Sequence, residues 1–426
     1  MFGCNEATRL EAEDALEPLL SGLRAGTRRV PRHRISRLLV VKTATCPPCR
    51  TFSIILPVPI SSYPPRVRTI DESLVVSSTS HCNQYNNATR QRPATMALRF
   101  DPEYQAAIAA RDSGGGGPAP PAPFKDVFEL RAFSEPMLRT VLRAQPAPDN
   151  VFETRIPFTS HDGQEVGLYR FATQEMIDSR EPLAAVVYVH GGGMVSCDVD
   201  IFSPQIKRFV EMVGMPFFAV DYRLAPEFPD GLGAEDVYLG LKYLSEHAAR
   251  WNVDNGNIVI MGDSAGGGLA AGATLMARDK SLQPPLRKQV LVYPMLDDRT
   301  SVPEKAAIYP LLSWKAHDSV LAWRAVLGDK AGDPRPSATE AGISLYAAPG
   351  RASVEELRGL PRTYVDVGGL DLFRDECVDF VRRLCEAEVE VEFHLWPGLP
   401  HGFESAPGIG WVRRALEARN DALRRI

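Results

Sequence analysis

The stretch Asn257-Ile-Val-Ile-Met-Gly-Asp-Ser-Ala-Gly-Gly267 decides how this chain is interpreted. Its apolar run, 258–261, is bounded by turn residues and predicts a short buried strand. The next five residues, 262–266, have the pattern G-x-S-x-G and lead into an Ala-rich helical run that ends at about Arg278. A strand, a tight turn and a helix form the context in which this pattern exposes a serine hydroxyl, here that of Ser264. The pattern alone is weak, because Gly and Ser are common in loops and an ordinary strand-to-helix turn explains it equally well.

Segments on both sides of this stretch alternate between strand and helix patterns. Two strand-like segments separated by Asp162-Gly163 predict a hairpin, and β-α repeats follow. Repeats of this kind predict an α/β fold, with a mostly parallel eight-stranded sheet covered by helices on both faces. The predicted strands are residues 151–158, 166–171, 184–189, 216–220, 258–261, 289–293, 362–367 and 389–395. The predicted helices are residues 205–213, 234–249, 265–278, 375–388 and 409–426.

The chain is expected to have three regions. Residues 1–95 lack a sustained apolar period and are expected to be disordered or not part of the native product, with Met96 as the alternative start. Residues 96–150 contain two short helical patterns, 101–111 and 127–144, which we expect to form a cap because neither helix could stand alone. The second pattern places near one face Phe128, Leu130, Phe133, Leu138 and Leu142. Residues 151–426 form the main domain, in which an insertion at about 294–359 carries Trp314 and Trp323.

Composition narrows the function classes. A net charge of −5 with both signs mixed gives no reason to expect nucleic acid as a partner. Seven cysteines are no disulfide framework, so a reducing, cytoplasmic location is expected. The pair Cys46-Pro-Pro-Cys49 has no second pair at metal-ligand spacing, and we expect neither a metal nor a redox site there. No apolar run is long enough to span a membrane, no secretory signal is recognisable, and a homodimer is left open.

The remaining polar motifs each follow a predicted strand, and sites in parallel sheets form at the carboxyl ends of strands. His190-Gly-Gly-Gly193 follows the strand two β-units before Ser264. Three consecutive glycines allow a close backbone approach, with N–H groups directed to where an oxyanion would develop. A flexible glycine turn is the alternative interpretation, but the position after this strand favours a functional loop.

A serine hydroxyl becomes a nucleophile only when a base takes its proton, and that base needs a carboxylate to hold its tautomer. His401 lies just beyond the last predicted strand, where it could reach the serine, whereas His394 lies within that strand. The acid should follow the preceding strand, where Asp371 is the best candidate. Asp366 and Asp375 are rivals, the first still inside the strand and the second typical of a helix start. The chain order Ser, Asp, His is that of the α/β-hydrolases.

Residues from about 96 to 420 resemble the hormone-sensitive-lipase-like branch of the α/β-hydrolase family. The resemblance rests on six motifs: His190–Gly193, Asp221-Tyr-Arg-Leu-Ala-Pro-Glu227, Gly262-Asp-Ser-Ala-Gly-Gly267, Tyr293-Pro-Met-Leu-Asp-Asp-Arg299, Leu370-Asp-Leu-Phe-Arg-Asp-Glu376 and His401-Gly-Phe403. It implies that Ser264 is the nucleophile, Asp371 the orienting acid and His401 the base. It also implies an oxyanion hole formed by the N–H groups of Gly192, Gly193 and Ala265.

The resemblance carries two further implications. Asp221, Arg223 and Glu227 are expected to form a buried polar network that shapes the site. Gly268 departs from the Asn of many relatives, a difference expected to affect packing and not the triad. Residues 1–95 have no counterpart in the family pattern.

The function implied is a cofactor-independent serine hydrolase that cleaves small carboxylic esters, of short to medium acyl chain length, through an acyl-enzyme. The sequence shows no metal cluster and no dinucleotide-binding fingerprint. Amide or lactone hydrolysis on the same triad is one alternative. A non-catalytic receptor is another, since the plant gibberellin receptors resemble this branch but lack a complete triad.

Overall fold

The computed structural model describes residues 98–113 and 123–426. The chain divides into two units, residues 1–90 and 91–426, and the described residues belong to the second. The expectations for residues 1–95, including the Cys46-Pro-Pro-Cys49 pair, concern residues outside the described ranges.

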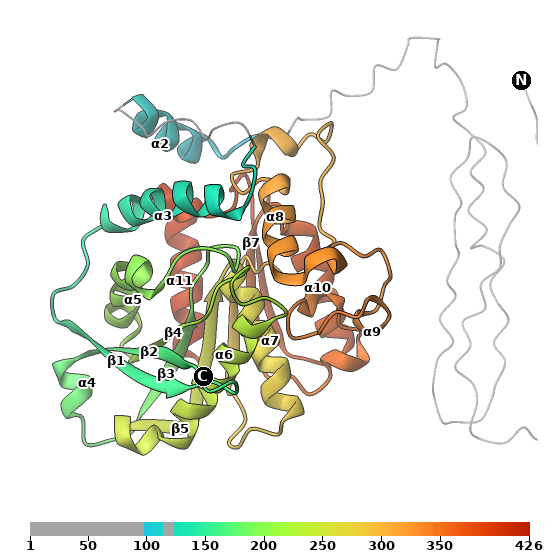
Figure 1. Cartoon of the computed structure of the whole chain (residues 1–426). Helices are drawn as coiled ribbons and strands as arrows, with labels where there is room; N and C mark the ends of the chain where they lie inside the picture. The colour runs from blue at the N-terminus through green and yellow to red at the C-terminus, as the bar shows by residue number, and fades with distance from the viewer. Residues whose placement is uncertain (1–97, 114–122) are drawn as a thin grey trace, which may run out of the picture. The chain divides into compact units, whose positions relative to one another are not determined.

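Eight strands of the described residues form one sheet in the order β1-β2-β4-β3-β5-β6-β7-β8 (Figure 1). The strands are β1 Val151–Thr159, β2 Glu165–Thr173, β3 Leu183–Val189, β4 Phe217–Asp221, β5 Val253–Asp263, β6 Lys288–Val292, β7 Arg362–Gly368 and β8 Val391–Trp396. β2 pairs antiparallel with β1 and with β4, whereas the other neighbouring strands are parallel. The predicted hairpin followed by β-α repeats is therefore confirmed.

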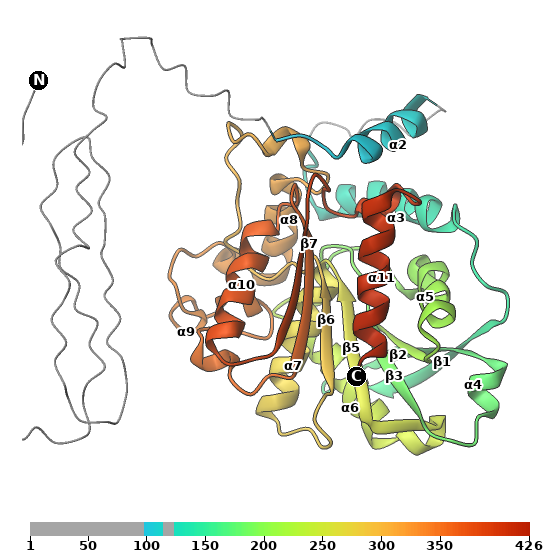
Figure 2. The same ribbon diagram turned by 180° about the vertical axis from the view of Figure 1, so that it is seen from behind.

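Helices cover both faces of the sheet, as the right-handed connections of parallel strands require. The connection from β3 to β4 runs toward β1, so its helix lies on the opposite face from the helices of the connections that run toward β8. Figures 1 and 2 show α5 and α11 on one face and α6 and α7 on the other. These helices, with α10 packed against β7 and β8, are α5 Val199–Val213, α6 Leu232–Glu246, α7 Ala265–Asp279, α10 Arg374–Glu386 and α11 Gly410–Arg424.

Two details of the helices differ from the sequence prediction. The helix predicted from residue 205 begins at Val199, because Asp198 caps it and its first turns bury Val199, Ile201 and Phe202 despite Pro204. Burial of these apolar residues outweighs the presence of proline at the sixth helical position. Phe128 is 53% exposed and does not share the inner face with Leu130 and Leu142. That part of the predicted stripe is wrong.

Helices α2 Pro102–Ser113, α3 Val127–Arg143 and α8 Ala316–Leu327 lie near the carboxyl ends of the parallel strands (Figure 1). α2 is joined to the rest of the unit by Asp101, whose N–H donates to Gly398 O at 2.9 Å. Asp126 caps the start of α3: its carboxylate accepts the N–H groups of the first turn. A cap of this kind stabilises the helix by about 1 kcal/mol. Shorter elements complete the unit: α4 Gln174–Asp178, α9 Ala338–Ala341, and the 3-10 turns η2 Ala248–Trp251, η3 Tyr309–Leu311, η4 Gly328–Lys330, η5 Pro349–Arg351, η6 Glu355–Leu357 and η7 Phe403–Ser405.

Gly268, the position that departs from many relatives, lies where α7 meets the loop after β6. A Cβ added to Gly268 would come 2.0 Å from the carbonyl oxygen of Met295, in a region of fixed backbone. Only glycine fits this approach without movement of the loop or the helix. The expectation that this residue affects packing is consistent with the contact, which lies one helical turn from Ser264.

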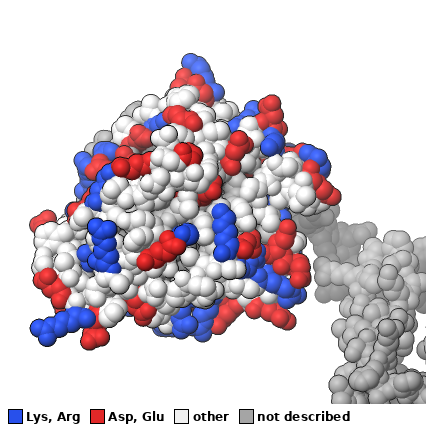
Figure 3. All heavy atoms as spheres, turned by 60° about the horizontal axis from the view of Figure 1, so that its bottom comes forward, with Lys and Arg blue, Asp and Glu red and all other residues white. Residues whose placement is uncertain are grey.

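The surface carries both charges in a mixed pattern. Figure 3 shows acidic and basic side chains interspersed over one face of the described unit, with no continuous patch of one sign. Within the part of the chain that the structure describes, no helix is both long and apolar enough to cross a bilayer.

Candidate active site

Ser264 occupies the sharp turn between β5 and α7. Its backbone has φ 58° and ψ −121°, a region that non-glycine residues rarely adopt and that costs free energy to hold. Three backbone hydrogen bonds hold the turn: Ser264 N–H donates to Val292 O at 2.8 Å, and Ser264 O accepts from Gly268 N at 3.1 Å and Met295 N at 2.9 Å. The side chain of Ser264 is thereby fixed at the carboxyl edge of the sheet.

His401 bridges Ser264 and Asp371. Its Nε2 lies 2.8 Å from Ser264 Oγ, and its Nδ1 lies 2.8 Å from Asp371 Oδ2. Asp371 is buried, and its other carboxylate oxygen accepts the N–H of Phe373 at 2.8 Å. An ionised Asp371 requires Nδ1 to carry the proton, which leaves Nε2 as the acceptor for the serine hydroxyl. The structure thus brings together the three residues that the sequence predicted.

Two aromatic rings and one backbone contact hold His401 in place. The rings of Tyr293 and Phe373 meet it edge-on, with centroids at 4.6 and 5.1 Å. Ser313 Oγ donates to His401 O at 2.6 Å. Tyr293 is itself anchored, because its hydroxyl donates to Glu404 Oε2 at 3.0 Å. Tyr293 entered the sequence analysis only as the first residue of a family motif, and Ser313 did not enter it, since neither belongs to a pattern of catalytic residues.

The rival residues lie elsewhere. Asp366 is buried within β7 and forms an ion pair with Arg419 at 2.7 Å. Asp375 pairs at 2.7 Å with its neighbour Arg374 and is largely exposed. His394 stacks on Trp396, with centroids 5.1 Å apart, and contacts Glu392. None of these three side chains contacts Ser264 or His401.

The glycine loop that follows β3 has the backbone conformation that its sequence allows. Gly192 and Gly193 have φ of 121° and 65°. A Cβ at Gly192 would lie 2.1 Å from Ser196 O, so the loop cannot accept a side chain there. Within the described residues, no group accepts a hydrogen bond from the N–H of Gly192 or Gly193. Ala265 is the first residue of α7, where helical N–H groups have no intrahelical acceptor.

His190, the residue before the three glycines, supports this loop. It is fully buried, its ring stacks on Tyr222 with centroids 4.3 Å apart, and its Nδ1 lies 2.7 Å from Gly191 O. Tyr222 OH donates to His190 O at 3.0 Å. Burial lowers the pKa of His190, so its imidazole stays neutral near neutral pH. We therefore interpret His190 as a structural residue of the loop.

The expected buried network of Asp221, Arg223 and Glu227 is wrong in its connectivity, because the three side chains contact different partners. Asp221 accepts the N–H of Val199 at 3.1 Å. Arg223 binds the buried Asp236, with Nη2 and Oδ1 2.7 Å apart. Glu227 is 43% exposed and pairs at 2.7 Å with Arg131 of α3. These three residues of one motif therefore have different partners, which a sequence pattern cannot reveal.

Asp263, directly before Ser264, has a role that sequence analysis missed. Its Oδ2 accepts from Tyr188 OH and from Gln205 Nε2, both at 2.7 Å, so the carboxyl joins the serine turn to β3 and α5. Burial raises the pKa of Asp263 from its ordinary 3.8 to about 6. The only sequence signal was its place within the G-x-S-x-G pattern, where we treated it as a variable position.

Among residues 98–113 and 123–426, no three His, Cys, Asp or Glu side chains converge as metal ligands.

Comparison with known proteins identifies the family. A family model described as alpha/beta hydrolase fold matches residues 186–405. The chain is 36% identical to esterase LipI of Mycobacterium tuberculosis over 240 residues, covering 56% of this chain and 70% of that protein. It is 27% identical to an ethyl acetate hydrolase of Pseudomonas putida, over 75% of this chain and 99% of that protein.

Solved structures agree. A bacterial heroin esterase superposes with a TM-score of 0.66 at 30% identity, covering 77% of this chain and 98% of that one. An esterase of Pyrobaculum calidifontis gives a TM-score of 0.62 at 28% identity, over 71% of this chain and 94% of that one. The fold, the family match and these relatives confirm the resemblance seen in the sequence. The chain belongs to the α/β-hydrolase family, in its hormone-sensitive-lipase-like branch of carboxylic ester hydrolases.

Proposed function

We propose that the chain hydrolyses carboxylic esters through an acyl-enzyme formed on Ser264, with His401 as base and Asp371 as orienting acid. The observation that carries this proposal is the continuous hydrogen-bonded path from Ser264 Oγ through His401 to Asp371 Oδ2, with both contacts at 2.8 Å. A path of this kind activates a hydroxyl at neutral pH, because the imidazole accepts the proton as the oxygen attacks.

Each chemical step uses the same groups. Ser264 Oγ attacks the ester carbonyl carbon while His401 Nε2 takes its proton, and a tetrahedral oxyanion forms. The N–H groups of Gly192, Gly193 and Ala265 stabilise that charge. The imidazolium then gives its proton to the departing alkoxide, which leaves the acyl group on Ser264. Water, deprotonated by His401, attacks this acyl-enzyme, and collapse of the second tetrahedral intermediate releases the carboxylic acid and restores the serine.

Helices α2 and α3, which belong to the described part of residues 96–150, act in this proposal as a cap over the acyl group. Arg131 of α3 supports the idea, because its Nε donates at 2.6 Å to Val195 O in the turn that closes the glycine loop. The insertion contributes as well: the ring of Trp314 approaches to 3.0 Å of a Cβ added at Gly193, and Ala322 follows at 3.5 Å. A bulky indole beside the oxyanion loop favours substrates with short to medium acyl chains.

Amide hydrolysis on the same triad is the second candidate. It is favoured by similarity to an arylacetamide deacetylase of Bos taurus, 29% identical over 267 residues, 50% of this chain and 67% of that protein. Amides demand the same acyl-enzyme but a poorer leaving group, so the two candidates share every residue and differ in the group that accepts the proton from His401.

A series of p-nitrophenyl esters from acetate to palmitate, with the matching p-nitroanilides, tests the proposal. We expect the highest kcat/KM with acetate to hexanoate, a steep loss for longer chains, and much slower cleavage of the anilides. Palmitate as the best substrate would contradict the chain-length proposal. Absence of ester turnover by a folded protein would contradict the proposed function itself.

A further inference from the structure

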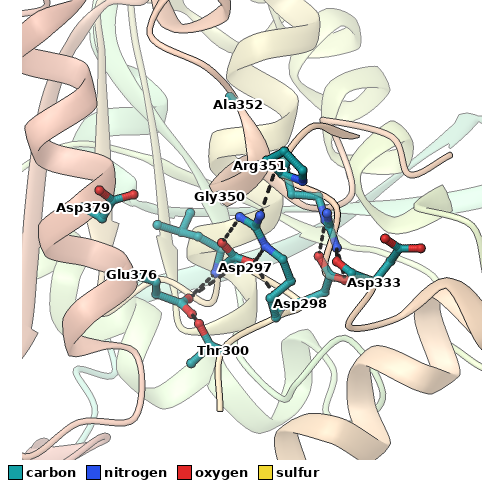
Figure 4. Close-up of polar contacts among 12 residues, drawn as sticks. Asp297, Asp298, Thr300, Asp333, Gly350, Arg351, Ala352, Glu376 and Asp379 are labelled. Atoms are coloured by element: carbon teal, nitrogen blue, oxygen red, sulfur yellow. Dashed lines mark hydrogen bonds and ion pairs between the residues drawn. The ribbon is translucent and has the colours of Figure 1, made fainter. Parts of the chain in front are cut away.

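Glu376 is a buried carboxyl that the proposed chemistry does not use. It lies in the first turn of α10, five residues after Asp371, and only 8% of the residue is exposed. Its Oε1 lies 2.6 Å from Leu296 N and 3.4 Å from Asp297 N, and its Oε2 contacts Thr300 Oγ1 (Figure 4). A carboxyl buried in this way costs free energy unless its oxygens are bonded, and here all its partners lie in one loop.

That loop, residues 294–300, also holds Ser264. Met295 N–H donates to Ser264 O at 2.9 Å, next in sequence to the N–H groups that Glu376 accepts. Leu296 is bonded through both its backbone groups, because Gly350 N–H donates to Leu296 O at 2.8 Å. The position of this loop therefore determines where the serine turn stands.

The backbone that carries Glu376 is joined to Asp371 by a short, hydrogen-bonded turn. The short turn from Asp371 to α10 is closed by Phe373 N–H, which donates to Asp371 Oδ1 at 2.8 Å, and by Cys377 N–H, which donates to Phe373 O at 3.0 Å. Cys377 Sγ adds a weak contact to Pro294 O at 3.5 Å. Glu376 thus lies between the acid turn and the loop that holds the nucleophile.

We propose that Glu376 is a positioning residue, which fixes the separation of the Asp371 turn and the Ser264 turn so that His401 can bond both at once. The inference rests on the proposed function. His401 spans the two groups with hydrogen bonds of 2.8 Å on each side, so a displacement of either turn lengthens one of them. Misplacement by about 1 Å can cost roughly 10²-fold in rate, because the groups no longer align for attack.

The chemistry of the contact suggests a conservative replacement. Burial raises the pKa of Glu376 well above its usual range, while the N–H of Leu296 and the hydroxyl of Thr300 donate to its two oxygens and oppose that shift. Glutamine keeps the acceptor for Leu296 N–H and places an amide beside Thr300, whose hydroxyl can accept as well as donate. Alanine offers neither and leaves the N–H of Leu296 without its acceptor.

Lys288 provides a control at the opposite edge of the sheet. It is the first residue of β6, only 8% of it is exposed, and its Nζ donates to Ala422 O and to Arg425 O, both at 2.6 Å. Ser264 lies at the carboxyl ends of the strands, so Lys288→Ala should weaken the fold without displacing the serine turn.

The test compares Glu376→Ala, Glu376→Gln and Lys288→Ala in the full chain by kcat and KM for p-nitrophenyl acetate, per site titrated with a fluorophosphonate, and by Tm. We expect Glu376→Ala to lower kcat roughly 10- to 100-fold with KM within about twofold of wild type. Glu376→Gln should stay within about threefold of wild-type kcat, and Lys288→Ala should lower Tm with kcat within about twofold.

Should Glu376→Ala not be recovered folded, Glu376→Asp replaces it, because its shorter side chain draws the oxygens away from Leu296 and predicts the same loss of kcat. A wild-type kcat in Glu376→Ala or Glu376→Asp overturns the inference, as does an equal loss of kcat in Lys288→Ala. Failure of the proposed function would look different, since wild type itself would then neither label nor turn over ester.

Discussion

Gly268→Ala is a demanding test of the contact between α7 and the loop after β6. The added Cβ would lie 2.0 Å from Met295 O, and approaches under 3.0 Å are essentially never seen, so helix and loop must separate by about 1 Å. Overpacking of this kind costs about 3 kcal/mol at the upper end of its usual range, because both neighbours are backbone. Alanine regains about 1 kcal/mol of helix propensity. We therefore expect a net loss of about 2 kcal/mol in the free energy of unfolding.

The same shift should reach the chemistry. Met295 N–H holds Ser264 O at 2.9 Å, so displacement of Met295 moves the serine turn and should lower kcat about tenfold with little change in KM. Gly233→Ala is the matched control. Gly233 lies in another helix, α6, and its added Cβ would meet Tyr222 at an ordinary 3.4 Å. Urea unfolding and ester kinetics measure both effects. A Gly268→Ala variant that is as stable and as active as the Gly233→Ala control would refute this reasoning.

Two further predictions concern the acids. Asp371→Asn should lower kcat by about 10⁴ through the wrong histidine tautomer, whereas Asp375→Asn should retain activity. Asp366→Asn should chiefly lower Tm, because the buried Arg419 then keeps only Glu404 as a carboxylate partner. Steady-state kinetics and thermal melts separate these outcomes. Asp263 predicts a pH effect on stability. The fold raises the pKa of Asp263 from 3.8 to about 6, so the folded protein holds the carboxyl proton more tightly than the unfolded chain does. The stabilisation that results is fully present below about pH 4 and is lost as the pH rises through about 6. Over this window wild type should lose about 3 kcal/mol of unfolding free energy relative to Asp263→Asn in urea titrations; a constant difference from pH 4 to pH 7 would show that Asp263 titrates normally.

Much of the fold could be predicted because its elements follow local patterns. The strands β3 and β4 are almost wholly apolar, β5 to β7 are apolar over part of their length, and each polar motif follows a strand at the same edge of the sheet. The order Ser264, Asp371, His401 then required the three residues to meet, since β5, β7 and β8 end at one edge. Periodicity and parallel topology led to this edge of the sheet, and the family resemblance then singled out Asp371 from its rivals Asp366 and Asp375.

Contacts between distant segments could not be predicted in the same way. Glu227 was expected in a buried network, yet it pairs with Arg131, 96 residues earlier, at an exposed position. The role of Glu376 depends on a loop 80 residues away, which no local pattern specifies. The start of α5 was missed because tertiary burial of its first turn outweighs the effect of Pro204 on local propensity.

The central claim is that Ser264 is the nucleophile of an ester hydrolase. Mass spectrometry of the protein treated with a fluorophosphonate tests it most directly, because the reagent bonds only to an activated hydroxyl. We predict a single modified peptide carrying the label on Ser264, together with loss of labelling and of ester turnover in a folded Ser264→Ala variant. Labelling at another residue, or substantial ester turnover by Ser264→Ala, would contradict the account.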